Sequence, residues 1–202
     1  MLADKDRIFT NVYGFQPWNL QSAMARGDWD KTKDLMVLGQ DGIIDKVKAK
    51  VFVFDRQSAL VGAAPALLGL GRGDDTVPGI GQRRLATIRP AERTTPAGRF
   101  EAALGNDFDQ DILWVDYDSA LSLHRVIVGN PADRRHARLA SPTPLDNRVS
   151  YGCINVPTKF YDSVVAPVFK GTVGIVYILP ETKPIEAVFA IHGARVPAVT
   201  VP

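Results

Sequence analysis

The single cysteine of the chain, Cys153, is the residue with the clearest capacity for covalent chemistry. Gly152 precedes it, so the backbone is free to turn sharply there and to come close to a bound ligand. A thiol at such a turn acts as a nucleophile when a base removes its proton and nearby donors stabilise the developing oxyanion. The neighbouring residues favour this interpretation, and a small buried hydrophobic residue is the alternative for an isolated cysteine.

Three histidines are candidates for the base, namely His124, His136 and His192. His124 lies in an alternating apolar run over residues 121–128, which predicts a strand, and a strand holds a side chain within the short reach that proton transfer needs. His136 lies in a polar segment among arginines, where neighbouring positive charges disfavour proton uptake. His192 follows the cysteine, near the C-terminus. We therefore expect His124 to be the base.

Stretches rich in β-branched, aromatic and alternating apolar residues predict a mainly β fold around these side chains. Strands are expected at residues 47–55, 59–68, 85–88, 98–104, 112–115, 121–128, 173–179 and 187–191. Asp41-Gly42 is typical of a turn. Pro65 is typical of an edge strand or a bulge, and Pro157 of the first turn of a helix. This spacing of short strands indicates a β-sandwich or barrel.

The stretch around the cysteine resembles the catalytic signature of the L,D-transpeptidases, whose YkuD-type domain builds peptidoglycan crosslinks. That signature reads S/T-x-G-C-I/L-R/N, and residues 150–155 of this chain read S-Y-G-C-I-N. Residues 95–100, T-P-A-G-R-F, resemble the family's T-P-x-G-x-F segment, and residues 122–124 resemble the strand end that delivers the family's base histidine. Tyr151 stands where most of the family has histidine, and the S-Y-G-C-I-N ending is similar to that of a proteobacterial branch.

The resemblance implies an L,D-transpeptidase-type β-sandwich or barrel with a short helix after the catalytic cysteine. We expect residues 43–202 to form the catalytic domain. Residues 1–42 are expected to form a small helical N-terminal segment, because apolar residues there recur at helical spacing. This segment is interpreted as an arm packed on the domain, and a lid or an anchor is the alternative.

The resemblance also implies a cysteine-dependent acyltransferase of peptidoglycan biosynthesis, acting on the cell wall. Cys153 would form a thioester with a peptidoglycan stem peptide, and the amine of a second stem peptide would then complete a crosslink. With water in place of that amine, the enzyme would be an L,D-carboxypeptidase. Another thiol amidase and a non-catalytic peptidoglycan-binding module are further alternatives. Neither a metal nor an organic cofactor is expected.

Individual roles follow from the resemblance at the motif positions, and for Arg138 and Arg148 from their place in an arginine-rich loop. The catalytic candidates are Cys153, His124, Gly152 and Ser150. The substrate-binding candidates are Tyr151, Asn155, Arg125, Arg138 and Arg148. Backbone N–H groups of Gly152 and Cys153, with that of Tyr151, are expected to hold the oxyanion. The backbone carbonyl of Arg125 is expected to orient the histidine, and Asn155 is expected to contact substrate or to fix the loop, with a helix-capping turn as its alternative.

Residues 129–149 form a long polar segment between the expected base and the cysteine. Long loops in compact domains are usually functional, and this one is rich in arginine. We expect it to form one wall of a substrate groove, with positive charge from Arg134, Arg135, Arg138 and Arg148 that binds stem-peptide carboxylates. A solvated basic surface is the alternative.

Composition argues against several other classes of function. A net charge of +2 is too small to indicate nucleic-acid binding, and no apolar run is long enough to predict a membrane span. The acidic residues between positions 107 and 118 lack the glycine and closing glutamate of a calcium loop and are interpreted as solvated turns. No signal peptide is visible, so the periplasmic location that the resemblance implies requires this chain to be a trimmed form. The oligomeric state is left open.

Overall fold

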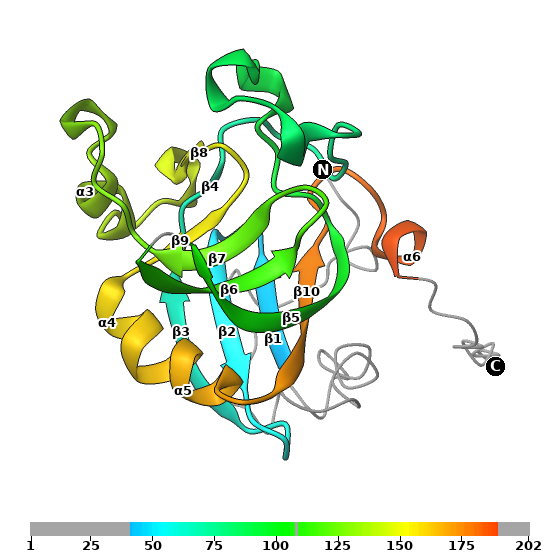
Figure 1. Ribbon diagram of the computed structural model, residues 1–202, viewed down its shortest axis with the longest axis vertical. Helices are drawn as coiled ribbons and strands as arrows, with labels where there is room; N and C mark the ends of the chain where they lie inside the picture. The colour runs from blue at the N-terminus through cyan, green and yellow to red at the C-terminus, as the bar shows by residue number, and fades with distance from the viewer. Residues whose placement is uncertain (1–40, 108, 190–202) are drawn as a thin grey trace, which may run out of the picture. The chain divides into compact units, whose positions relative to one another are not determined.

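The computed structural model describes residues 41–107 and 109–189, which contain the expected catalytic region (Figure 1). The helices expected before residue 41 and the candidate base His192 lie outside the described residues. Within the described ranges, no helix is both long and apolar enough to cross a membrane.

Strands make up most of the regular structure in these ranges. The strands are β1 (Asp41–Asp45), β2 (Lys50–Phe54), β3 (Leu60–Pro65), β4 (Leu68–Gly69), β5 (Gly98–Asp107), β6 (Gln110–Asp116), β7 (Leu121–Arg125), β8 (Arg148–Ser150), β9 (Ile154–Val156) and β10 (Val173–Leu179). The α-helices are α3 (Arg135–Leu139), α4 (Thr158–Phe160), α5 (Ala166–Phe169) and α6 (Ile185–Val188), with a π-helical turn, Tyr161–Val165, between α4 and α5. Short 3-10 helices are η2 (Ile80–Gln82), η3 (Leu85–Thr87), η4 (Pro90–Glu92), η5 (Pro131–Asp133) and η6 (Pro144–Asp146). The predicted mainly β fold class is therefore confirmed.

One mixed sheet holds eight of the strands, in the order β3-β2-β1-β10-β5-β6-β7-β9. β1 is parallel to β10 and β7 is parallel to β9, whereas the other neighbours are antiparallel. β4 and β8 form a separate parallel pair. Just after β3, Leu67 exchanges two backbone hydrogen bonds, of 2.8 and 2.9 Å, with Asn155 in β9. The two ends of the strand order are therefore joined through Leu67.

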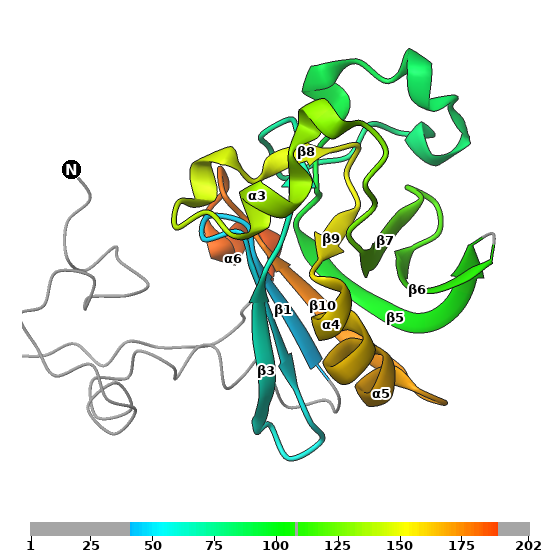
Figure 2. The same cartoon turned by 90° about the vertical axis from the view of Figure 1, so that its left-hand side faces the viewer.

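β5 carries the sheet from one half of the domain to the other. Residues 98–103 pair with β10, and residues 103–107 pair with β6. Figure 2 shows β5 curving between the two halves, with α4 and α5 beside them. The bend lets side chains from both halves and from the helical stretch share one apolar core.

The core also sets the direction of the side chains on β7 and β9. Leu123 and Ile154 are register partners on these strands, and both are buried in the core. Because successive side chains of a strand point to opposite faces, their neighbours on each strand point away from it. Full burial of each such side chain contributes roughly 1.5–3 kcal/mol, so the register of the two strands is well determined.

Three local predictions are wrong. Asp41-Gly42 lies inside β1, where pairing with β10 and β2 overrides the turn signal, and the turn follows at residues 46–49. Residues 85–87 form η3, in which Ile88 N–H bonds back to the Leu85 carbonyl at 3.1 Å. The described part of the expected last strand lies at α6, which begins after Pro184, a residue without an N–H for a strand ladder.

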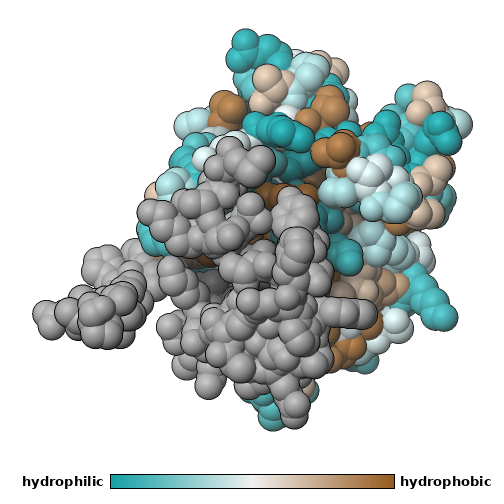
Figure 3. All heavy atoms as spheres, turned by 180° about the vertical axis from the view of Figure 1, so that it is seen from behind, coloured by the Kyte–Doolittle hydropathy of each residue, from teal (hydrophilic) through white to brown (hydrophobic). Residues whose placement is uncertain are grey.

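The surface seen from behind is mixed. Where Figure 3 is coloured, hydrophilic residues predominate, and hydrophobic patches are small and separated. Folded proteins commonly expose scattered apolar side chains of this kind.

Candidate active site

The register of β7 and β9 brings four polar side chains onto one face of the sheet. Leu123 pairs with Ile154, and the next pair along is His124 with Asn155. Ser122 and Cys153 precede the first of these pairs. Alternation therefore places all four polar residues on the same side, facing away from the core.

The sulfur of Cys153 lies among groups from β7 and from the turn before it. Ser122 Oγ donates a hydrogen bond to Cys153 Sγ at 3.5 Å, and the Ala120 carbonyl oxygen lies 3.5 Å from the same sulfur. The residue is half-buried and lines a cleft. A thiol in this position borders the cleft and is held by the strand beside it.

His124 is oriented by the backbone of its own strand. Its Nδ1 lies 2.7 Å from the carbonyl oxygen of Arg125. Since a carbonyl oxygen only accepts, Nδ1 carries the proton, and Nε2 is left as the nitrogen that can take one from the sulfur. The carbonyl contact implied by the resemblance is therefore present.

The protonation of Cys153 is tuned by opposing effects. Burial raises the pKa of the thiol, whereas the hydrogen bond and the charge of His124 lower it, and the hydroxyl and backbone N–H of Ser122 lower it further. The net result is a pKa below that of an ordinary cysteine. A lowered pKa increases the thiolate fraction at neutral pH, and the thiolate is the nucleophilic form.

The turn before the cysteine is fixed by its own hydrogen bonds. Ser150 Oγ donates to the Cys153 carbonyl at 2.6 Å and accepts from Gly152 N–H at 3.1 Å. Gly152 has a φ of 139°, and a Cβ there would lie 2.9 Å from the Thr94 carbonyl oxygen. Glycine is required at this position both by its backbone conformation and by the space available.

The second sequence motif meets the first at this turn. Thr95, the first residue of the T-P-A-G-R-F segment, is fully buried. Its hydroxyl donates to the Gly152 carbonyl at 2.7 Å and accepts from Gly69 N–H at 2.9 Å. The two motifs that carry the resemblance are therefore in direct contact through a single hydroxyl group.

A small cleft of about 80 Å³ opens at the sulfur. Its lining residues are Thr76, Ile80, Gly81, Arg83, Leu85, Ile88, Thr94, Pro96, Ser119, Ala120, Leu121, Tyr151, Gly152 and Cys153. One wall thus comes from residues 76–96, the region of the short 3-10 helices, where the guanidinium of Arg83 pairs with Glu92 at 3.2 Å. Tyr151 lines the cleft and is partly exposed, and the guanidinium of Arg93 stacks over its ring at 3.9 Å.

Residues 129–149 do not line this cleft, and Arg134 and Arg138 instead line a separate open hollow of about 410 Å³. The segment is also not structureless, since it contains η5, α3 and η6. Arg138 donates to the Asp133 carbonyl at 2.6 Å and to the Asp146 carbonyl, so its hydrogen bonds stay within the segment. His136 is exposed on α3 and is not brought to the cysteine.

Two other predicted arginines also have internal partners. Arg148 pairs with Glu181 and is 12% exposed. Arg125 binds Asp111 at 2.8 Å and Asp162 at 2.6 Å, and its guanidinium lies over the buried ring of Tyr161. Neither guanidinium lines the cleft.

Asn155 is buried, and its side chain lies between Arg135 and the cysteine turn. Its Oδ1 accepts from Arg135 at 3.0 Å, and its Nδ2 donates to the Cys153 carbonyl at 3.2 Å. The side chain therefore fixes the cysteine turn, which is one of the two roles that the resemblance implies. It lies in β9 and caps no helix.

Sequence reasoning missed two residues that contact the site. Ser122 precedes His124 by two positions, and the alternation of a strand would have placed both on one face. Arg83 lies in a segment without periodicity, so no sequence signal pointed to the cleft. Within residues 41–107 and 109–189, no cluster of histidine, cysteine or acidic side chains is arranged to hold a metal ion.

No protein-family model matches the chain. The mitochondrial NADH-ubiquinone oxidoreductase 51 kDa subunit from Aspergillus niger is 52% identical over 48 residues, which are 24% of this chain and 10% of that protein. The corresponding 51 kDa protein from Neurospora crassa is also 52% identical over 48 residues, again 24% of this chain and 10% of that protein. The chain thus spans about a tenth of these relatives, and the matches assign it to no family.

Solved structures with a similar arrangement include a cell shape determining protein and L,D-transpeptidases. The helical cell shape determining protein Pgp2 from Campylobacter jejuni has a TM-score of 0.44 at 14% identity, over 72% of this chain and 49% of that one. An L,D-transpeptidase from Xylanimonas cellulosilytica has a TM-score of 0.41 at 14% identity, over 69% of this chain and 60% of that one. The catalytic domain of the Enterococcus faecium L,D-transpeptidase has a TM-score of 0.37 at 15% identity, over 68% and 96%. At these values the likeness does not assign this chain a family.

Proposed function

We propose that this protein is a cysteine-dependent acyltransferase of the L,D-transpeptidase type that acts on peptidoglycan stem peptides outside the cytoplasm. The observations that carry the proposal are the orientation of His124 by the Arg125 carbonyl, the position of Cys153 in the lining of a cleft, and the effect of His124 in lowering the pKa of the thiol. A nucleophile, a base and a group that orients the base are the three parts that covalent acyl transfer requires. The S-Y-G-C-I-N and T-P-A-G-R-F segments, which meet at this site, support the choice of substrate.

In the first half-reaction, Nε2 of His124 takes the proton of the Cys153 thiol. The sulfur attacks a carbonyl carbon of the donor stem peptide, and a C–S bond forms. When the resulting oxyanion collapses, the peptide C–N bond breaks and His124 returns the proton to the leaving amine. The product is a thioester on Cys153.

In the second half-reaction, the amine of an acceptor stem peptide attacks the thioester carbon. His124 takes a proton from that amine, the C–S bond breaks, and the proton returns to the sulfur. A new amide bond crosslinks the two stem peptides, and the free thiol is restored. Water in place of the amine would release a shortened stem peptide with a new carboxylate.

The oxyanion requires backbone donors that are not already engaged. Gly152 N–H donates to Ser150 Oγ, so it is committed to the turn. We therefore assign the binding of the oxyanion to the backbone N–H groups of Tyr151 and Cys153, the two residues on either side of Gly152. Loss of one such donor typically lowers the rate about 100- to 1,000-fold.

Incubation of the protein with purified muropeptides, followed by mass spectrometry of the products, tests the proposal. Crosslinked dimers that depend on Cys153 are the expected result. Shortened monomers alone would indicate a carboxypeptidase or another thiol amidase. Unchanged muropeptides that nonetheless bind the protein would indicate a non-catalytic binding module and contradict the proposal.

A further inference from the structure

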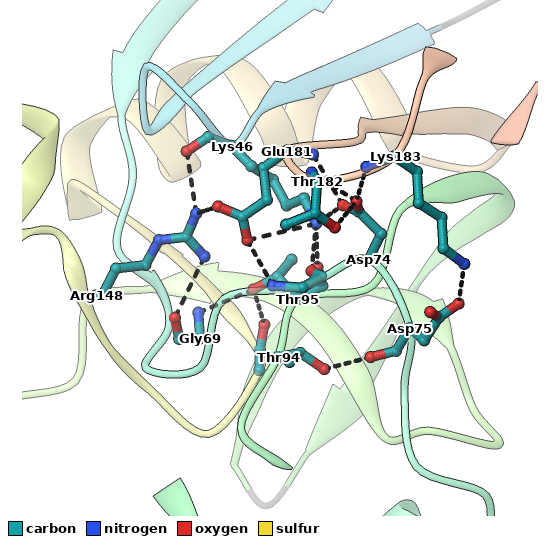
Figure 4. Close-up of polar contacts among 12 residues, drawn as sticks. Lys46, Gly69, Asp74, Asp75, Thr94, Thr95, Arg148, Glu181, Thr182 and Lys183 are labelled. Carbon is teal, nitrogen blue, oxygen red and sulfur yellow. Dashed lines mark hydrogen bonds and ion pairs between the residues drawn. The ribbon is translucent and has the colours of Figure 1, made fainter. Parts of the chain in front are cut away.

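Four charged side chains from distant parts of the sequence form one buried cluster (Figure 4). They are Lys46 after β1, Asp74 after β4, Arg148 at the start of β8 and Glu181 after β10. Lys46 Nζ lies 2.6 Å from Asp74 Oδ1, and neither side chain has exposed surface. Arg148 pairs with Glu181, whose other carboxylate oxygen lies 3.8 Å from Lys46 Nζ. Two cations thus face two anions away from water.

The Lys46 ammonium group uses its full set of three donors. They bind the Gly73 carbonyl at 2.7 Å, Asp74 Oδ1 at 2.6 Å and the Thr95 carbonyl at 2.9 Å. Asp74 is itself held by the backbone N–H groups of residues 181, 182 and 183. With every donor engaged and its counter-ion fixed, the ammonium group determines where the Thr95 backbone lies.

Thr95 connects this cluster to the cysteine turn. Its carbonyl binds Lys46, and its hydroxyl donates to the Gly152 carbonyl at 2.7 Å. Among the described residues, Thr95 is the one that bonds both Lys46 and the Gly152–Cys153 turn. A single residue, Thr95, therefore links the buried Lys46 ammonium group to the cysteine turn.

The backbone of residues 93–95, which contains Thr95, is tightly packed. A Cβ on Gly69 would lie 2.2 Å from the Arg93 carbonyl oxygen, and one on Gly152 would lie 2.9 Å from the Thr94 carbonyl oxygen. Residues 93–95 are thus in close contact with glycine backbone on both sides. Close packing of this kind transmits strain, so we expect a shift of Thr95 to be felt at the cysteine turn.

We propose that Lys46 is a positioning residue for Cys153, acting through Thr95 to hold the sulfur in reach of His124. The inference rests on the proposed function, because it takes Cys153 to be the nucleophile. A buried ion pair commonly adds little stability over apolar residues of the same volume, since removing the charges from water is costly. A fixed geometry at the nucleophile is the benefit that this cluster provides.

The test measures how the rate of Cys153 alkylation by iodoacetamide depends on pH, in the full chain. Thr95→Val removes the hydroxyl and keeps the carbonyl for Lys46, and Lys46→Met removes the ammonium. Each is expected to raise the apparent pKa of the thiol and to slow alkylation at neutral pH about tenfold for each unit of the rise. Thr95→Ser should restore the wild-type profile, and the double variant should be no slower than the slower single variant.

Thr182→Val is the matched control. Thr182 donates its hydroxyl to Asp74 Oδ2 at 2.5 Å, so the variant also loses a hydroxyl bond of the cluster. Thr182 is not among the hydrogen-bond partners of the Thr95 and Gly152 groups that form the link. It should keep the wild-type alkylation profile, even with a lower thermal midpoint. Equal effects of Thr182→Val and Thr95→Val would mean general loosening and would overturn the proposal.

A folded Lys46→Met or Thr95→Val protein with the wild-type profile would also overturn it, as would additive effects in the double variant. If Lys46→Met does not fold, Thr95→Val and its serine rescue decide the matter, because the hydroxyl is the link. Alkylation needs no peptidoglycan, so the two proposals can fail separately. Shifted profiles in a protein that yields no muropeptide product would refute the proposed function and leave the positioning role standing.

Discussion

The cysteine turn with β7 and the arginine-rich segment 129–149 use polar residues in opposite ways. At the turn, strand register places Ser122, His124 and Cys153 on one face beside a cleft. In the segment, Arg138 donates to the carbonyl oxygens of residues 133 and 146, so its hydrogen bonds hold the segment together. Arg135 of the same segment donates to Asn155 Oδ1 at 3.0 Å, so the segment also supports the cysteine turn. The register of the strands places the polar groups of the candidate site, and arginines of the segment hold backbone and side chains in place.

Replacing the nucleophile should give the largest difference between the two regions. Cys153→Ala is expected to lower turnover by a factor on the order of 10⁴ or more, since the covalent step is lost. The side chain is half-buried at a cleft, so the change in unfolding free energy should stay below about 1 kcal/mol. Turnover and thermal midpoint are measured together. Retained activity, or a lost fold, would contradict the assignment of Cys153.

The two histidines offer a matched comparison between the regions. His124→Gln should reduce the rate roughly 100- to 10,000-fold, the range of general acid–base catalysis, and should raise the apparent thiol pKa. His136→Gln, in the exposed α3, should leave both quantities unchanged. Steady-state kinetics and a pH series of thiol alkylation report the two effects. A larger loss in the His136 variant would reverse the comparison.

Alanine substitutions at two glycines compare a constrained backbone position with an unconstrained one. Gly152→Ala should cost about 1–3 kcal/mol and reduce activity, because φ is 139° and the Thr94 carbonyl occupies the space of the new methyl group. Gly129→Ala, where a Cβ meets nothing within 4 Å, should be nearly neutral. Thermal unfolding of both variants checks the difference, and equal midpoints would contradict a constrained turn.

The smallest effects concern substrate contacts. Arg83 pairs with Glu92 at 3.2 Å and so holds the cleft wall in place. Arg83→Gln should therefore raise KM several-fold with little change in kcat, which is the mark of lost uniform binding. Arg134→Gln, in the arginine-rich segment, should leave KM unchanged. A rise in KM for Arg134→Gln but not for Arg83→Gln would indicate that residues 129–149 form the substrate groove.

Tyr151→Phe should keep most activity in the same kinetic assay, since only the backbone N–H of Tyr151 is assigned to the oxyanion.

Much of the fold could be read from the sequence where pairing and pattern agree. β5, β6, β7 and β10 lie where alternation or apolar runs predicted them. β1 was missed because Asp41-Gly42 carries a turn signal that pairing on both sides overrides. Residues 85–87 carry apolar residues but form a 3-10 helix, which periodicity over so short a run does not distinguish from a strand.

The site was predictable to the extent that it is local. Cys153 and His124 were predicted from a turn glycine, a strand context and the resemblance of residues 150–155 to a family signature, and His124 lowers the pKa of the Cys153 thiol. Lys46, Asp74 and Glu181 carried no sequence signal, because their meeting depends on the closure of distant segments. Their cluster became visible only from the spatial arrangement.

The central claim is that Cys153, activated by His124, becomes acylated by a stem peptide. Intact-mass spectrometry of the protein mixed with a donor stem peptide measures this directly. We predict an adduct equal to the donor less its leaving amine, located on the Cys153 peptide, formed by wild type and His136→Gln, strongly slowed in His124→Gln and absent in Cys153→Ala. Crosslinked product without any such adduct, or an adduct that survives Cys153→Ala, would contradict the account.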